Sequence, residues 1–142
     1  MKRIDILKNV ISKQLEIISE IEKSVNQYKN ASDIDEDDTI DPEDFSHQSE
    51  AKEMQLHFEQ HLNKEKEKLI LLESNKNFID KIKIVISKNY VILLGVSFPK
   101  FENEKFYIGI SESAPLYSKI INLEIGNQFN IGNQNEVILN IL

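Results

Sequence analysis

Apolar side chains recur at alternating steps of three and four residues from Ile4 to Tyr28, which is the spacing of a heptad seam. No glycine or proline interrupts this stretch, and charged residues such as Lys8 and Glu16 fall off the seam. The pattern predicts one helix over residues 4–28, about 40 Å long. The seam consists of Ile4, Leu7, Ile11, Ile18, Ile21, Val25 and Tyr28, with the polar Gln14 in the place of one member.

A second helix is expected to begin at Asp41-Pro42. Asp41 is a favourable N-cap, Pro42 suits the first helical position, where its missing N–H is not needed, and Asp44 can reach back as in a capping box. The helix should run to about Glu73, although polar residues such as Glu65 interrupt its apolar face. That face consists of Ala51, Met54, Phe58, Leu62, Leu69 and Leu72. Two long helices joined by a short polar segment are expected to pack as an antiparallel hairpin.

β-branched and aromatic residues become frequent from residue 82 onward, which indicates strands. Strands are predicted over residues 82–87, 90–98 and 105–110, with turns at 88–89 and 99–104 between them. Pro115 can open a short helix that ends near Asn122. Residues 128–131 and 137–142 predict two closing strands around Gly132-Asn133.

The predicted fold class is therefore α+β, with two parts. Residues 1–75 are expected to form an antiparallel coiled-coil hairpin whose acidic tip spans residues 33–44. Residues 78–142 are expected to form a small α+β domain. A unit of this size is near the lower limit for a free-standing core, so docking on the base of the hairpin should add stability.

Eight carboxylates crowd the twelve residues from Asp33 to Asp44, and no Lys or Arg occurs between Lys29 and Lys52. The chain has a formal net charge of −7, so without these eight acids it would carry about +1. Carboxylates at this density repel one another and cannot be buried unpaired. The segment is therefore expected in water, on a cation, or against a positively charged or metal-bearing partner.

The remaining composition indicates the cellular compartment of the protein and argues against some classes of partner. The chain has no cysteine, so it can form neither a disulfide nor a thiolate metal site, which fits a reducing cytosol. Charges interrupt the apolar stretches that could serve as an export signal or a membrane span. We therefore expect a cytoplasmic protein without membrane contact. The negative net charge argues against autonomous DNA binding, which is driven by Lys and Arg.

Two local patterns carry more specific information. Near the tip, Asp41-Pro42-Glu43-Asp44 is followed by Ala51-Lys52-Glu53-Met54-Gln55. In the C-terminal part, Ile110-Ser111 leads to Ala114-Pro115-Leu116, then to Asn122 and Gly126-Asn127. The first resembles Asp-x-x-Glu and Ala-Lys/Arg-Glu-x-Gln, and the second resembles Ile-Ser-x-x-Ser-Pro-Leu, a helix-ending Gly and Gly-Asp. Both belong to the Gre family of bacterial transcript-cleavage factors, which insert a helical hairpin into the secondary channel of RNA polymerase.

The chain departs from the Gre patterns by substitutions at individual positions. Asp44 stands where the family has Glu, which shortens the reach of a metal ligand by one methylene. Ala114 and Asn127 replace Ser and Asp and so remove polar groups. Asn122 stands where the family has Gly at a helix end, and Asn tolerates a left-handed backbone better than most residues.

The resemblance implies a function at the tip. Asp41 and Asp44 would help to ligate a Mg²⁺ held jointly with RNA polymerase, with Asp37 and Asp38 as further ligands, and no metal would bind tightly to the chain alone. The ion would activate a water for attack on backtracked RNA near its 3′ end, in a two-metal arrangement. The protein would then be no enzyme itself. Very acidic tips in the wider family inhibit polymerase, so stimulation and inhibition both stay open.

The resemblance also implies a fold and a binding role for the C-terminal part. It implies a small FKBP-like β-rich domain with one short helix, docked at the rim of the polymerase channel. Ser111, Ser113 and Pro115 would contact the polymerase there.

Two other interpretations use the same acidic residues. Asp41 and Asp44 could serve only as helix caps. Alternatively, the segment is a calcium loop of a helical hairpin or interaction module, with Asp33, Asp35, Asp37, Thr39, Asp41 and Asp44 at loop positions one, three, five, seven, nine and twelve. Asp38 stands where such a loop has Gly, Asp44 replaces its bidentate Glu, and no second loop is present.

One further pair of residues has metal-ligand spacing. His57 and His61 lie four residues apart on the second predicted helix. The sequence HFEQH is not the H-E-x-x-H arrangement, and no third ligand is evident. We expect these histidines to be exposed or to lie at the edge of the seam.

Overall fold

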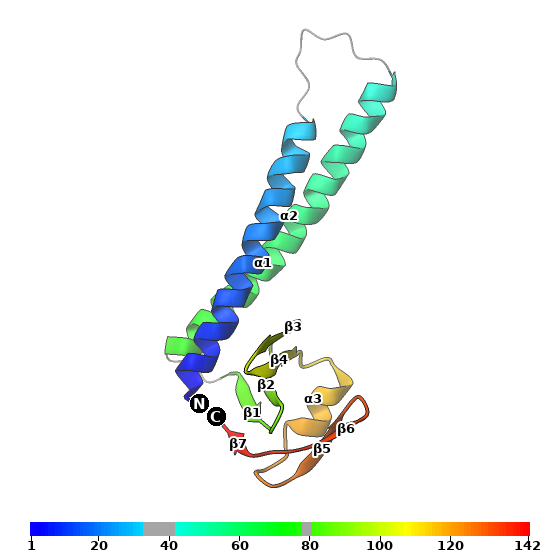
Figure 1. Ribbon diagram of the computed structural model, residues 1–142. Coiled ribbons are helices and arrows are strands. Elements are labelled where there is room, and N and C mark those ends of the chain that lie inside the picture. Colours follow the sequence, from blue (N-terminus) through cyan, green and yellow to red (C-terminus); the bar gives the residue numbers. More distant parts are fainter. Residues whose placement is uncertain (33–41, 78–80) are drawn as a thin grey trace. The chain divides into compact units, whose positions relative to one another are not determined.

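A computed structural model describes residues 1–32, 42–77 and 81–142 of the chain (Figure 1). The chain divides into two compact units. One comprises Ser12–Leu69, and the other joins Met1–Ile11 to Ile70–Leu142. Each unit is described by itself below.

Two long helices form the N-terminal part. Helix α1 spans Arg3–Ser32 and helix α2 spans Pro42–Asn77, so both are longer than the sequence pattern predicted. The predicted start of the second helix at Pro42 is confirmed. No glycine or internal proline stops either helix, so both continue past the ends of their apolar faces although the added residues include Asn and Ser, which are weak helix formers.

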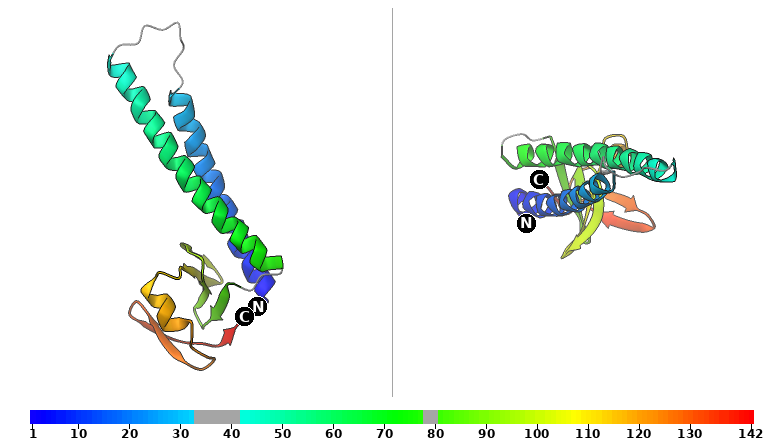
Figure 2. Two further views of the ribbon diagram at one scale, coloured as in Figure 1. Left: turned by 180° about the vertical axis from the view of Figure 1, so that it is seen from behind. Right: turned by 90° about the horizontal axis from the view of Figure 1, so that it is seen from above.

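In the unit Ser12–Leu69 the two helices pack antiparallel (Figures 1 and 2). Ile18, Ile21 and Leu62 form the buried cluster between them. The rings of Tyr28 and Phe58 stack with centroids 5.4 Å apart. Most of the predicted apolar face of α2 in this unit is at least half-buried, but Met54 is exposed and does not belong to it.

The other unit contains a five-stranded mixed sheet. Its strands are β1 (Lys83–Ile86), β2 (Tyr90–Leu94), β3 (Phe98–Asn103), β4 (Lys105–Ile110) and β7 (Asn140–Ile141), in the order β3-β4-β2-β1-β7. β2 and β4 are parallel, and the other neighbours are antiparallel. All five residues of β2 are buried. The α+β fold class is therefore confirmed.

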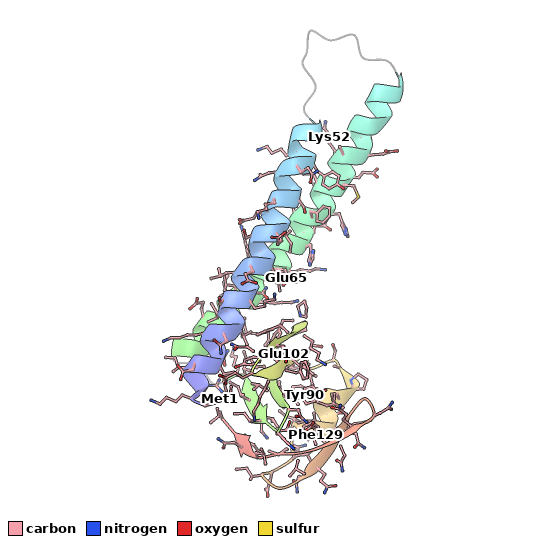
Figure 3. All side chains as sticks on the ribbon, viewed as in Figure 1. Met1, Lys52, Glu65, Tyr90, Glu102 and Phe129 are labelled. Atoms are coloured by element: carbon pink, nitrogen blue, oxygen red, sulfur yellow. The ribbon has the colours of Figure 1, made fainter. Side chains whose placement is uncertain are left out.

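A hydrophobic core lies on one face of this sheet. Helix α3 (Pro115–Ile120) contributes Ile120, and the two-stranded sheet of β5 (Gln128–Ile131) and β6 (Gln134–Val137) contributes Phe129. These side chains pack against Tyr90, Ile92 and Leu94 of β2 (Figure 3).

The opposite face of the sheet is also covered. Val91 of β2 is fully buried and pairs in register with Tyr107 of β4, so the two side chains share a face. The Tyr107 hydroxyl accepts a hydrogen bond of 3.1 Å from Asn9 Nδ2, which places the first turns of α1 on this face. Ile6, Leu7 and Val10 of α1 are buried, whereas Ile4 is 42% exposed, contrary to the predicted seam. The heptad spacing fails here because α1 contacts a sheet in this unit as well as a helix.

The end of α2 is fixed by one side chain, Asn75. Its Oδ1 accepts hydrogen bonds of 2.8 Å from the backbone N–H groups of Lys81 and Ile82, and its Nδ2 donates to the carbonyl of Leu71. Asn75 therefore joins the last turn of the helix to the residues before β1.

The predicted turn at residues 99–104 is wrong, because most of it is strand β3. Pro99 can lie in a strand here since β3 is an edge strand of the sheet. The turn is the single residue Glu104, with φ 63°, and it is the only described residue other than glycine with a positive φ. Phe101 of β3 stacks on Tyr107 with centroids 4.8 Å apart. Asn122 does not have a positive φ, so it does not take the left-handed conformation expected of it.

The strand after the closing turn is also misplaced in the sequence analysis. β5 is confirmed, but its partner β6 ends at Val137, and β7 leaves to pair with β1. A short repeat accounts for the hairpin: Ile125-Gly126-Asn127-Gln128 recurs as Ile131-Gly132-Asn133-Gln134. Both glycines have positive φ, 91° and 56°, so each repeat makes a turn and then starts a strand.

Gly109 of β4 is the tightest glycine in the sheet. A Cβ there would lie 2.5 Å from Phe98 Cδ1 and 2.5 Å from the Val96 carbonyl oxygen. We predict that Gly109→Ala lowers the free energy of unfolding by about 2–3 kcal/mol, because backbone must move. Gly132→Ala is the control, since its Cβ meets nothing within 4 Å and only the positive φ opposes it; it should cost about 1 kcal/mol. Urea unfolding followed by tyrosine fluorescence measures both, and equal losses would contradict the close approach.

Candidate functional site

The acidic segment falls largely outside the described residues. Asp37, Asp38 and Asp41 lie in the undescribed range 33–41, and Asp44 lies in the first turn of α2 with its side chain outside the description. The structure therefore neither brings these carboxylates together nor separates them. It does describe the helices that lead to the segment, which end at Ser32 and begin at Pro42.

The calcium alternative depends on residues in the same undescribed range. Of the described residues, no group of three His, Cys, Asp or Glu could hold a metal ion. The rings of His57 and Phe58 lie edge to face with their centroids 5.8 Å apart, and His61 Nε2 lies 3.5 Å from Glu65 Oε1. The expected exposure of both histidines is confirmed.

A buried polar layer lies between the helices of the unit Ser12–Leu69. Gln14 of α1 is 1% exposed and Glu65 of α2 is 6% exposed. The Gln14 Nε2 group donates hydrogen bonds of 2.9 Å to the Glu65 backbone carbonyl and 2.6 Å to its Oε2 atom. The two polar residues that interrupt the apolar faces thus meet each other (Glu65 is labelled in Figure 3). Each of these polar residues is visible in the sequence as an interruption of its own helix, but their contact depends on the register of the two helices.

The Glu65 carboxylate has two basic neighbours on its own helix. Lys68 Nζ donates a hydrogen bond of 3.0 Å to Oε1, and His61 Nε2 lies 3.5 Å from the same atom. Burial raises the pKa of Glu65, but the hydrogen bonds from Gln14 and Lys68 and the charges of Lys68 and His61 together hold its pKa below the usual value. The carboxylate is therefore ionised and buried. Gln14 Oε1 is a buried side-chain oxygen that no described group satisfies.

The two helices remain packed against each other as they approach the acidic segment. Beyond the polar layer, Lys66 Nζ lies 3.8 Å from Glu22 Oε1 across the pair, and the Tyr28 and Phe58 rings stack further along α1. Ala51 of α2 is buried at 9% exposure. The unit thus offers a packed two-helix frame for the residues that connect its helices.

The predicted polymerase contacts of the C-terminal part lie together on the loop after β4. Ser111 Oγ is 3.2 Å from Ser113 Oγ, and Pro115 is the first residue of α3. Ala114 occupies the N-cap position of α3 and makes no side-chain cap hydrogen bond. A Ser at this position, as in the Gre pattern, would cap the helix. Ser113 and Pro115 are exposed and Ser111 is half-buried.

No helix in the described ranges combines the length and the apolar character that a membrane span requires. Comparisons with protein-family models, with curated proteins and with solved structures found no match for this chain. The family resemblance therefore stays a prediction from the tip and C-terminal patterns.

Stability should fall in acid because of Glu65. Its pKa is lower in the folded state than in the unfolded chain, where it is about 4.3. The stabilisation is therefore complete above the unfolded pKa and is lost as pH falls through the lower folded pKa. We predict that Glu65→Gln flattens the decline in melting temperature below about pH 5, measured by far-UV circular dichroism. The exposed Glu53→Gln should leave the decline unchanged, and identical pH profiles for both variants would contradict the assignment.

The polar layer should contribute specificity of pairing more than stability. Gln14→Leu removes a donor from a buried carboxylate, so we predict a loss of about 2 kcal/mol in the free energy of unfolding. Gln14→Leu combined with Glu65→Leu replaces both groups by apolar ones and should recover at least the parent stability. Urea unfolding measures both. A double variant less stable than Gln14→Leu would show that the pair is itself strongly stabilising.

Proposed function

We propose that this protein is a Gre-like regulator that binds bacterial RNA polymerase in its secondary channel and modulates elongation or transcript cleavage. Its acidic segment would reach the active-site Mg²⁺ and lie near the RNA 3′ end. The protein would be cytoplasmic and would alter the activity of the polymerase without being an enzyme.

One observation carries the proposal most directly. Two long antiparallel helices lead to the two ends of the acidic segment, with α1 ending at Ser32 and α2 beginning at Pro42. The buried Gln14–Glu65 contact, the Ile18–Ile21–Leu62 cluster and the Tyr28–Phe58 stack hold these helices together. A stiff pair of helices is a means of presenting a charged segment to a recessed site.

The chemistry of the segment fits Mg²⁺, which prefers carboxylate oxygens and keeps several other ligands. Asp41 directly precedes α2 and Asp44 stands in its first turn, so the pair would hold an ion together with ligands of the polymerase. The ion would supply an activated water to the phosphodiester. Asp37 and Asp38 would add ligands, and in such an excess an unproductive geometry would make the protein an inhibitor.

For the C-terminal part we propose an FKBP-like arrangement that docks on the polymerase through Ser111, Ser113 and Pro115. Support comes from the five-stranded mixed sheet with α3 packed on one of its faces. Two of the three residues are exposed beside the start of that helix.

Asp41→Asn combined with Asp44→Asn tests the tip. Asn keeps the N-cap at position 41 but removes the negative charge that a metal ligand needs. Added to stalled, backtracked elongation complexes, the parent protein should change the rate of RNA cleavage or extension, and the double variant should lose at least about 90% of the change, as expected when about 1.4 kcal/mol or more of a metal-dependent effect is removed.

The exposed acids Glu102 and Glu124 supply a matched control, since Glu102→Gln with Glu124→Gln removes the same charge outside both the tip and the 111–115 loop. This control should act like the parent. Unaltered polymerase activity under conditions of confirmed binding would contradict the proposal. Micromolar Ca²⁺ uptake by the isolated protein in calorimetry would instead support the calcium-binding alternative.

A further inference from the structure

One end of the five-stranded sheet surrounds a hollow of about 420 Å³. Lys88 lines it from the β1–β2 turn, and Glu104 and Lys105 line it from the β3–β4 turn. Met1, Ile86 and Leu139 contribute apolar side chains to its lining. The topology brings these residues together, because Phe106 N–H bonds the Asn89 carbonyl at 2.9 Å and Ile86 pairs with Asn140 of β7. Ser111 lies at the opposite end of β4, so this hollow is separate from the polymerase contact proposed above.

The charged groups of the hollow favour an anion. The Lys105 ammonium donates a hydrogen bond of 2.6 Å to the Ser87 carbonyl, which fixes its position, and this contact leaves its positive charge uncompensated. Lys88 is exposed, and within the described parts of the chain it forms no ion pair. Glu104 lines the same hollow but pairs with neither lysine in that description. Two lysines and one glutamate therefore line the hollow, which gives the side chains of its lining a net positive charge.

The apolar groups of the hollow favour a large aliphatic or aromatic side chain. Of the apolar residues that line the hollow, Met1 and Leu139 are each 55% exposed and Ile86 is 6% exposed. A single exposed leucine is ordinary, but two large apolar side chains that line one concave surface form a patch that a partner could cover. A volume of this size accommodates two or three side chains of a peptide.

The backbone at Glu104 is the strained element of the hollow. A left-handed conformation costs an ordinary residue about 1 kcal/mol more than it costs glycine. The turn itself needs only that conformation, which glycine or asparagine would supply at lower cost. Glutamate adds a carboxylate, and a carboxylate at the rim can accept a hydrogen bond from the backbone N–H of a bound chain.

We propose that this hollow binds an extended peptide of a partner protein that carries a carboxylate side chain next to a large apolar one. Lys88 and Lys105 would bind the carboxylate, and Leu139 with Met1 would cover the apolar side chain. Charge complementarity selects an acidic partner over a basic one. The inference does not depend on a role in transcription.

Titration of the ¹⁵N-labelled full chain with two peptides tests the proposal. The probes are acetyl-Leu-Asp-Leu-Glu-amide and its charge-reversed counterpart acetyl-Leu-Lys-Leu-Lys-amide, followed by amide chemical shifts. The acidic probe should give saturable shifts at Lys88, Lys105 and Leu139 with a dissociation constant of about 1 mM. Added salt should weaken its binding. The basic probe should not. Shifts elsewhere, equal shifts with both probes, or no saturable shift would overturn the proposal.

Two pairs of variants make the test specific. Lys88→Glu should weaken binding of the acidic probe by about tenfold, and Leu139→Ser should weaken it by about threefold. The matched controls are Lys119→Glu and Ile125→Ser, which change an equally exposed lysine and an exposed apolar residue away from the hollow. The controls should bind like the parent. Unchanged affinity for Lys88→Glu in a folded protein, judged by its preserved amide spectrum, would refute the site.

Discussion

The central strand β2 is buried along its whole length, and the architecture of its unit follows from the need to cover it on both faces. Helix α3 and the β5–β6 pair cover one face through Ile120 and Phe129. The first turns of α1 cover the other, where Asn9 bonds the Tyr107 hydroxyl. A strand of five consecutive apolar residues therefore requires segments from both sides of the sequence around it. This constraint explains why the start of α1 departs from the pure heptad pattern.

The chain contains two kinds of acidic residue, the buried Glu65 and the eight acids of the segment 33–44. Glu65 is buried, and it is ionised only because Gln14 and Lys68 donate to it and His61 adds a nearby charge. The eight acids of the segment 33–44 have no basic residue near them in sequence and cannot all be satisfied in the same way. The first kind joins two helices of one chain. The second kind is suited to a cation or a partner, which is the physical basis of the proposed action at a metal centre.

The helices and the fold class could be predicted because their signals are long and local. An uninterrupted heptad seam and the Asp41-Pro42 start give the pair of helices, and the start at Pro42 is confirmed. The misassigned segment 99–104 shows the limit of local signals, since Pro99 indicates a turn in sequence but occupies an edge strand whose position depends on the rest of the sheet. β7 lies within the predicted strand 137–142, but its pairing with β1 could not be predicted, because it depends on the arrangement of the whole sheet. For the candidate site, the interruptions at Gln14 and Glu65 were visible, but their contact depends on the mutual register of two helices.

The division of the chain has a consequence for the order of folding. The unit that contains the sheet is discontinuous, because Met1–Ile11 and Ile70–Leu142 are separated by the whole of Ser12–Leu69. Its pairing is long-range, and the backbone of Ile84 bonds that of Leu142 in both directions. The backbone hydrogen bonds within each helix of the inserted unit are local and form quickly, whereas the sheet must close a much longer loop. During synthesis on the ribosome the helices of the insertion can therefore form early, whereas Asn9 of α1 can contact Tyr107 of β4 only after a further 98 residues have been made.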